Sequence, residues 1–186
     1  MNESLFRFLN NLVGQNYFFD EVVLFSANLL IFSVIIALAF YILKAKEGKE
    51  VTLKNSAVVL LTVFTAFACA EVIKNQFPNP RPFVALDSVN MLFEHGDYDS
   101  FPSGHTAILS AFAFALMFYS RRIGLIMLLV AFITGIARVM SGVHWPVDII
   151  GGFLLGGFFA LLTHYSYLEY QKRYGKPGRR VFDIEK

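Results

Sequence analysis

Five long apolar runs with almost no charge inside them limit what this chain of 186 residues can fold into. A helix that crosses a lipid bilayer needs roughly 20 consecutive, mostly apolar residues. Short connections join the runs, which cover Val22–Leu43, Asn55–Ala70, Phe101–Ser120, Ile123–Ala137 and Ile149–Leu168. The sequence therefore predicts an all-α, integral-membrane helical bundle with about five transmembrane helices.

The alternative is a soluble helical protein, but its surface helices should each carry a polar face, and these runs carry almost none. Only 16% of the residues are charged, against about 25% in an average soluble domain. The single cysteine, Cys69, cannot form an internal disulfide. The formal net charge of +2 is too small to indicate a nucleic-acid partner.

The first 15 residues predict an amphipathic helix and not a signal peptide. They contain the acidic Glu3, have no basic start and lack a small-residue cleavage site. Apolar residues recur there at helical spacing, at Leu5, Phe6, Phe8, Leu9, Leu12 and Val13. Such a helix can lie on the membrane surface, enter it partway, or cap the bundle, and the sequence leaves these alternatives open.

The basic residues are distributed unevenly between the two sides that five spans create. One side receives 12 of the 16 Lys and Arg residues, in 44–54, 121–122 and the stretch after Tyr170. The other side receives Arg7, Lys74, Arg81 and Arg138. Because cytoplasmic loops carry the excess of basic residues, we expect an outside N-terminus and a cytoplasmic C-terminus. We expect one domain over 1–186, with a basic cytoplasmic tail at 171–186.

The first polar motif follows the second apolar run. Lys74 ends this run, and Arg81 follows in Phe77-Pro78-Asn79-Pro80-Arg81-Pro82. Pro82 biases Arg81 toward an extended backbone, which fixes the direction of a guanidinium suited to a phosphate. The alternative is a pair of cations that reach for the membrane interface without binding a ligand.

The second motif, Pro102-Ser103-Gly104-His105, lies at the start of the third run. Unpaired amides in the first turn of a helix attract anions, and Gly104 lets a ligand approach the backbone. The alternative is an ordinary helix cap with an interfacial histidine.

The third motif joins the fourth and fifth runs, from Arg138 to Asp148. His144 and Asp148 are four residues apart, a spacing that places side chains on one helix face. A carboxylate on one ring nitrogen leaves the other nitrogen free to act as nucleophile or base. The alternative is a structural His–Asp cap.

The span count brings all three motifs to the same side of the membrane. Three cations at one low-dielectric rim repel one another, and a multiply charged anion is their natural partner. The set predicts phosphoryl transfer in which one histidine attacks and another protonates the leaving group. The sequence offers neither a carboxylate cluster for Mg²⁺ nor Cys/His spacing for Zn²⁺. We therefore expect no metal and no cofactor.

With these motifs the chain resembles the type 2 phosphatidic acid phosphatase superfamily, which also includes vanadium haloperoxidases. The motif core covers 74–148, and its three parts have the family's spacing: Lys74 to Arg81-Pro82, Pro102-Ser103-Gly104-His105, and Arg138 to His144 to Asp148. One departure is Ala137, where the family usually has a serine.

The resemblance implies a role for each residue of the motifs. His144 would attack phosphorus and form a phosphohistidine, Asp148 would orient His144, and His105 would protonate the leaving oxygen. The phosphoryl group would be held by Lys74, Arg81, Ser103, Gly104 and Arg138.

The resemblance also implies a class of substrate. The chain is similar to compact bacterial undecaprenyl-diphosphate phosphatases of the cytoplasmic membrane, so we expect a membrane lipid phosphate presented outside the cytoplasm. Undecaprenyl diphosphate is the first expectation; phosphatidylglycerol phosphate, phosphatidic acid and lipid A 1-phosphate are alternatives, as substrates of a phosphatase or a phosphotransferase. An anion or lipid-phosphate transporter is the alternative of another class.

Overall fold

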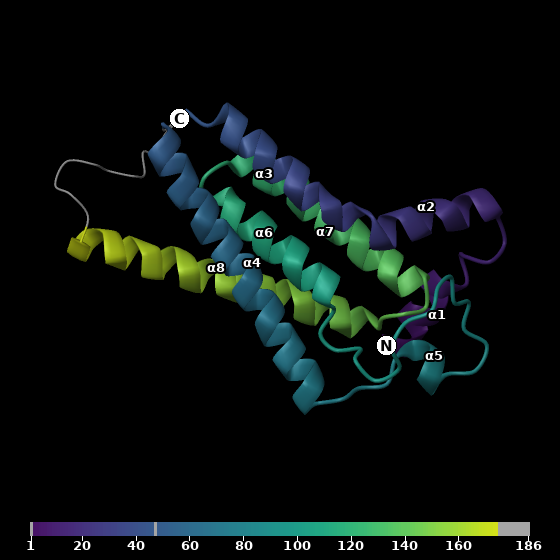
Figure 1. Ribbon diagram of the computed structural model, residues 1–186. Helices are drawn as coiled ribbons and strands as arrows, with labels where there is room; N and C mark the ends of the chain where they lie inside the picture. Colours follow the sequence, from purple (N-terminus) through teal and green to yellow (C-terminus); the bar gives the residue numbers. More distant parts are fainter. Residues whose placement is uncertain (1, 47, 175–186) are drawn as a thin grey trace.

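The computed structural model describes residues 2–46 and 48–174, and these residues form a bundle of helices (Figure 1). Within the described residues, the only strand-like feature is an isolated bridge between Asn79 and Asp99. The prediction of an all-α bundle is therefore confirmed. The elements are α1 (Asn2–Asn10), α2 (Tyr17–Asn28), the 3₁₀ helix η1 (Leu30–Phe32), α3 (Ser33–Lys44), α4 (Lys49–Gln76), α5 (Pro82–Ala85), α6 (Gly104–Met117), α7 (Arg121–Met140) and α8 (Pro146–Tyr174).

Three described helices, α4, α7 and α8, are long and apolar enough to cross a membrane. The first expected span, Val22–Leu43, is a broken helix: α2 and the segment of η1 and α3 are bent by 42°. The helix breaks after Asn28, a residue of low helix propensity. Its side-chain amide donates to the carbonyl of Leu24 and its oxygen accepts from Arg138, 110 residues away.

The third expected span, Phe101–Ser120, is shorter than the sequence indicates. Its helix, α6, has 14 residues, about 21 Å, against a hydrocarbon core of about 30 Å. Ser103 occupies the N-cap position without a side-chain capping bond, and the helix ends where the amide of Phe118 donates to the carbonyl of Ala115. Ten of the 14 residues of α6 are buried, and the helix packs against α4, α7 and α8. The apolar run therefore reflects burial inside the bundle more than contact with lipid.

Two glycines let α8 pack closely against α6. A Cβ atom at Gly156 would lie 2.1 Å from Oγ of Ser110, and one at Gly152 would lie 2.9 Å from the carbonyl oxygen of Ser103. Ser110 also donates to the carbonyl of Gly152. This close packing fixes the first turn of α6 beside the first turns of α8.

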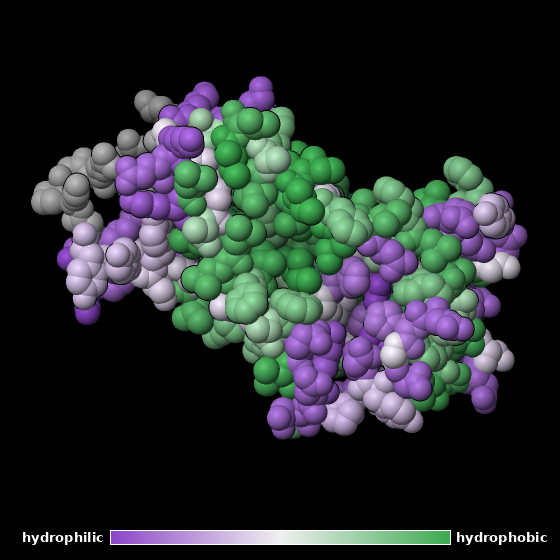
Figure 2. All heavy atoms as spheres, viewed as in Figure 1, coloured by the Kyte–Doolittle hydropathy of each residue, from purple (hydrophilic) through white to green (hydrophobic). Residues whose placement is uncertain are grey.

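The outer surface separates into a hydrophobic belt and two hydrophilic ends (Figure 2). Large apolar side chains such as Ile36, Phe64 and Leu154 are exposed on the belt. One end carries α1, α5 and the loops beside them, and the other carries the α3–α4 junction and the end of α8 (Figure 1). The chain is thus a multi-span membrane protein.

The N-terminal helix α1 is amphipathic, and it packs across the ends of α7 and α8. Phe6 is buried against Trp145, with ring centroids 5.3 Å apart, whereas Leu5 and Phe8 are exposed. Residues 171–174 of the expected basic tail belong to α8. The rest of that tail, 175–186, lies outside the described residues.

Candidate functional site

All eight predicted site residues lie at helix ends on the side of the bundle that carries α1 and α5 (Figure 1). Five elements deliver them: Lys74 is in the last turn of α4, Arg81 precedes α5, Ser103, Gly104 and His105 begin α6, Arg138 is in the last turn of α7, and His144 and Asp148 lie at the start of α8. The three sequence motifs, separated by up to 74 residues, are therefore brought to one place.

His144 is buried between a carboxylate and a guanidinium. Its Nδ1 lies 3.2 Å from Oδ2 of Asp148, and its Nε2 lies 3.3 Å from a terminal nitrogen of Arg81. An arginine can only donate, so Nε2 accepts and the ring proton lies on Nδ1. Burial, then the charges of Arg138 and Arg81, lower the pKa of His144 well below 6.5. The imidazole is therefore neutral at pH 7, with its lone pair on Nε2.

Asp148 accepts three hydrogen bonds on one oxygen. Besides His144, its Oδ2 accepts from Oγ of Ser100 at 2.5 Å and from the backbone amide of Trp145 at 2.8 Å. Its own carbonyl accepts from the amide of Ser103 at 3.1 Å, which ties the cap of α6 to the first turn of α8. The carboxylate is thus held in one orientation toward the histidine ring.

Arg81 is fully buried and holds several segments together. It donates to the carbonyl of Val143, to Oδ1 of Asp99 at 3.0 Å and to the backbone oxygen of Asp99 at 3.3 Å. Its backbone is extended, as Pro82 predicts. Burial alone would raise the pKa of Asp99, but the hydrogen bond and charge of Arg81 outweigh burial and lower it. The carboxylate therefore stays ionised and fixes the guanidinium.

A short backbone pairing positions Arg81. The amides of Asn79 and Arg81 donate to the carbonyls of Tyr98 and Asp97, each at 2.9 Å, and the amide of Ser100 donates to the carbonyl of Asn79 at 3.2 Å. The proline-rich stretch after α4 is therefore fastened to the end of the long loop before α6.

Lys74 reaches the first turn of α6. A Cβ atom at Gly104 would lie 3.2 Å from Nζ of Lys74, so the ammonium lies close to this backbone. The same ammonium donates to Glu71 at 2.8 Å. His105 is half-buried and directly follows Gly104 in the first turn of α6. Lys74, Gly104 and His105 therefore belong to one site.

Arg138 is buried and only partly bonded. One terminal nitrogen donates to Oδ1 of Asn28 at 3.2 Å, and its guanidinium lies 5.3 Å from the ring centroid of Phe93. Its Nε has no hydrogen-bond partner among the described residues. Since a buried donor is costly to leave unpaired, this guanidinium is suited to bind an acceptor such as a phosphoryl oxygen.

Several side chains at the site have no motif that would reveal them in the sequence. Asn28 comes from the first span, and the others come from the long loop: Phe93, His95, Asp99 and Ser100. The useful signal is the loop itself, since a long loop in a compact domain is usually functional.

Asparagines hold α1 against the site. Asn10 is buried, and its side-chain amide donates at 2.8 Å to the carbonyls of Met140 and Asn90. The amide of Asn90 returns a bond to Oδ1 of Asn10 at 2.9 Å. Gly142 turns the chain here with φ +83°, and a Cβ on it would lie 3.0 Å from the carbonyl of Asn90. The helix α1 and the long loop thus support the segment that carries His144.

No group of three or more His, Cys, Asp or Glu side chains in the described part of the chain could hold a metal ion. The donors gathered at the site are instead arginine, lysine, serine and backbone amides, which suit an anion. A metal-free reaction stays a prediction.

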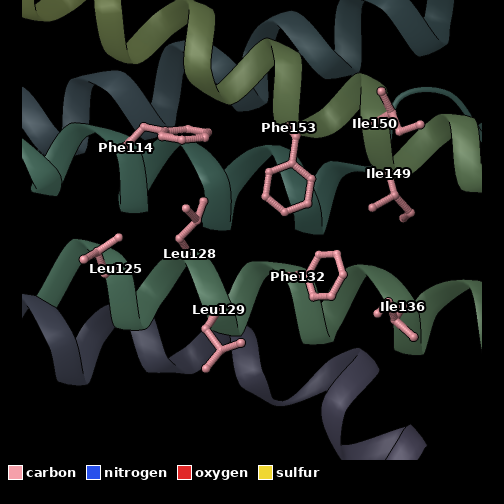
Figure 3. A pocket seen from close by; sticks show the side chains of 9 residues that line it. All are labelled: Phe114, Leu125, Leu128, Leu129, Phe132, Ile136, Ile149, Ile150 and Phe153. Carbon is pink, nitrogen blue, oxygen red and sulfur yellow. The ribbon is translucent and has the colours of Figure 1, made fainter. Parts of the chain in front are cut away.

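An apolar groove of about 590 Å³ opens on the bundle between α7 and α8. Figure 3 shows Ile136 and Ile149 near one end of it and Leu125 at the other. From Leu125 to Ile136 the groove runs along roughly 17 Å of α7. Ile149 directly follows Asp148 in α8, so the Ile136–Ile149 end of the groove is the end nearer the site along the helix. The lining residues are Phe114, Leu125, Leu128, Leu129, Phe132, Ile136, Ile149, Ile150 and Phe153.

Comparisons with known proteins agree with this arrangement. The sequence pattern of the PAP2 superfamily matches residues 55–172. The bacitracin transport permease protein BcrC of Bacillus licheniformis is 34% identical, over 89% of this chain and 80% of that protein. The undecaprenyl-diphosphatase BcrC of Bacillus subtilis is 29% identical, over 83% of this chain and 78% of that protein. The crystal structure of Aquifex aeolicus LpxE superposes with a TM-score of 0.73 at 29% identity, over 88% of this chain and 94% of that chain.

Proposed function

The chain belongs to the PAP2 superfamily of membrane phosphatases, and from this premise we propose that it hydrolyses undecaprenyl diphosphate to undecaprenyl phosphate and inorganic phosphate. The observation that carries the proposal is the state of His144. Its Nδ1 is bonded to Asp148, and its Nε2 lone pair lies 3.3 Å from an Arg81 nitrogen. This neutral ring is the nucleophile of the proposed reaction. Attack requires that the Arg81 N–H leave the Nε2 lone pair and donate to a phosphoryl oxygen instead.

The proposed reaction has two steps, and it uses no metal. Nε2 of His144 forms a bond to the terminal phosphorus while the bond from that phosphorus to the bridging oxygen breaks. His105 is protonated when the negatively charged diphosphate is bound, and it gives that proton to the bridging oxygen, which leaves on undecaprenyl phosphate. Water then attacks the phosphohistidine, His105 takes the proton of this water, and phosphate leaves as the nitrogen–phosphorus bond breaks.

Five groups would hold the phosphoryl oxygens during both steps. They neutralise charge that develops on those oxygens, which is the largest single contribution in many enzymes. The clearest of them are Arg138, whose Nε has no partner within the described part of the chain, and Lys74, beside the backbone of Gly104. The full set is Lys74, Arg81, Ser103, Gly104 and Arg138.

Two observations support an isoprenoid lipid as the substrate. A relative similar over most of this chain is named as an undecaprenyl-diphosphatase. The groove is lined by apolar side chains alone, and its nearer end is one residue along α8 from Asp148, which suits the hydrocarbon chain of a lipid whose phosphate is at the site. Burial of such a chain supplies about 0.8 kcal/mol for each CH₂ group.

We propose that the protein lies in a bacterial cytoplasmic membrane, with the site outside and the C-terminus in the cytoplasm. The described basic residues at the end opposite the site support this orientation through the positive-inside rule; they are Lys44, Lys46, Lys49, Lys54, Arg121, Arg122, Lys172 and Arg173. Hydrolysis of added substrate by intact spheroplasts, without lysis, checks the orientation.

The function is tested by phosphate release from purified protein in detergent. The panel holds undecaprenyl diphosphate, phosphatidylglycerol phosphate, phosphatidic acid and lipid A, each with and without EDTA. We expect EDTA-resistant release, fastest from undecaprenyl diphosphate. His144→Ala should lose the activity and still fold, with a lower melting temperature, because removing this buried ring leaves a cavity and takes a hydrogen-bond partner from Arg81 and from Asp148. A cooperative melting transition checks that the variant is folded.

Three results would contradict this proposal. If His144→Ala still releases phosphate, His144 is not the nucleophile. If EDTA abolishes phosphate release by the unmodified protein, the mechanism is not metal-free. Because one relative is named as a transport permease, transport is the second candidate function. Flux of labelled lipid phosphate into liposomes without any phosphate release would establish transport in place of hydrolysis.

A further inference from the structure

His95, in the loop between α5 and α6, is a third histidine at the site and lies outside all three motifs. Its ring is edge-on to the ring of His144, with centroids 6.4 Å apart and planes at 63°. Its neighbour Phe93 lies 6.3 Å from it and also faces the guanidinium of Arg138. Asp99 of the same loop accepts a hydrogen bond from Arg81. The loop therefore contacts Arg81 of the first motif and Arg138 of the third.

Local bonds fix which nitrogen of His95 carries the proton. The backbone amide of Gly96 donates to Nδ1 of His95 at 2.9 Å, so Nδ1 is an acceptor. In a neutral imidazole the proton then lies on Nε2, which becomes a donor. Burial, then the charges of Arg81 and Arg138, lower the pKa of His95 to about 4, so the ring is neutral at pH 7.

We infer that His95 is a further substrate-binding residue, whose Nε2–H donates a hydrogen bond to an oxygen of the phosphoryl group that His144 attacks. The inference rests on the proposed function for the reaction, but the binding itself requires only a phosphate-like anion at the site. A neutral donor adds a bond to the anion without adding another charge to the cluster of Arg81, Arg138 and Lys74.

Vanadate tests this inference, because it takes the five-coordinate geometry of phosphoryl transfer and its binding can be measured without turnover. His95→Phe keeps a planar ring and removes the donor. His95→Gln places an amide N–H near the position of Nε2. A hydrogen bond to a charged group corresponds to roughly a 10- to 100-fold change in binding.

We expect His95→Phe to weaken vanadate binding in calorimetry roughly 10- to 100-fold, and to lower kcat/KM for undecaprenyl diphosphate by a similar factor. His95→Gln should recover most of both losses. Met91→Ala, an exposed position in the same loop, is the matched control and should bind vanadate as the unmodified protein does.

Equal vanadate affinity in His95→Phe and the unmodified protein would overturn the inference. So would equal losses in the Phe and Gln variants, because a role in packing alone does not depend on the donor. If the unmodified protein binds vanadate but releases phosphate from none of the lipids, the proposed function fails while the calorimetry still decides the role of His95.

Discussion

The site end of the bundle and its middle are held together by different interactions. At the site end, buried polar side chains connect distant segments by hydrogen bonds. Arg81 donates to the carbonyl of Val143 and to Asp99. Asn10 donates to the carbonyl of Met140. In the middle, α6 and α8 pack backbone to backbone, at distances that only glycine permits. Polar networks fix directions, whereas close packing fixes distances. Hydrogen bonds therefore set the orientation of the reacting side chains, and glycines set the distance between the helices that carry them.

Among the variants that compare these two regions, the largest effect should come from replacing the carboxylate of Asp148. In Asp148→Asn, an amide oxygen can keep the three bonds at Oδ2 but not the negative charge that stabilises the imidazole as it bonds phosphorus. We expect kcat to fall on the order of 10³-fold with little change in melting temperature. Single-turnover phosphate release measures this.

Ser100→Ala is the control that separates the hydrogen bonds to Asp148 from its negative charge. It removes one of the three bonds to Asp148 and leaves the charge, so its loss of kcat should stay below roughly tenfold. A loss in Asp148→Asn no larger than that of Ser100→Ala would show that the hydrogen bonds, and not the charge, are what matters.

The next effect should appear in the middle of the bundle and in stability. In Gly156→Ala the new Cβ would lie 2.6 Å from the amide of Ala111, so α6 and α8 must separate. Overpacking costs about 1–3 kcal/mol, or roughly 2–12 °C in melting temperature for a chain of this size. Scanning fluorimetry in detergent measures it.

Gly157→Ala, one residue further along α8, is the matched control. Its Cβ would meet Phe114 at 3.5 Å, an ordinary contact, and alanine favours helix more than glycine does. Its melting temperature should be unchanged or higher. If Gly156→Ala and Gly157→Ala have the same melting temperature, close packing at Gly156 does not stabilise the middle of the bundle.

The smallest effect should be the response of stability to pH at the site end. The pKa of His95 is about 4 in the folded protein, below the 6.5 of an unfolded chain. Between these values the unfolded state binds more protons, so stability is complete above about pH 6.5 and falls as the pH drops toward 4. The pKa of His144 is lowered too and adds to this fall.

We expect the melting temperature to fall between pH 7 and 4.5, and His95→Gln to lessen that fall by roughly 2–4 °C, since the half-buried ring is partly screened by solvent. Melting curves in detergent at a series of pH values measure the difference. An identical fall in both proteins would contradict the account of His95.

The sequence predicted the helices and the three motifs because each depends on a local pattern. It missed the length of α6, because an apolar run does not reveal where buried helix gives way to buried turn. It missed Asn28, which bonds Arg138 across 110 residues, and Asp99, which bonds Arg81 across 18. Such partners have no fixed spacing, so only the folded chain identifies them.

The helix break after Asn28 has a consequence for how the family pattern should be understood. That pattern begins at residue 55, yet Asn28 holds Arg138, Asn10 holds the carbonyl of Met140, and Phe6 covers Trp145. The signature is therefore a partial specification of the enzyme. Two members with identical motifs can therefore bind phosphate with different affinities. Substitutions in the first 44 residues, as in the long loop before α6, can change that affinity without altering a motif.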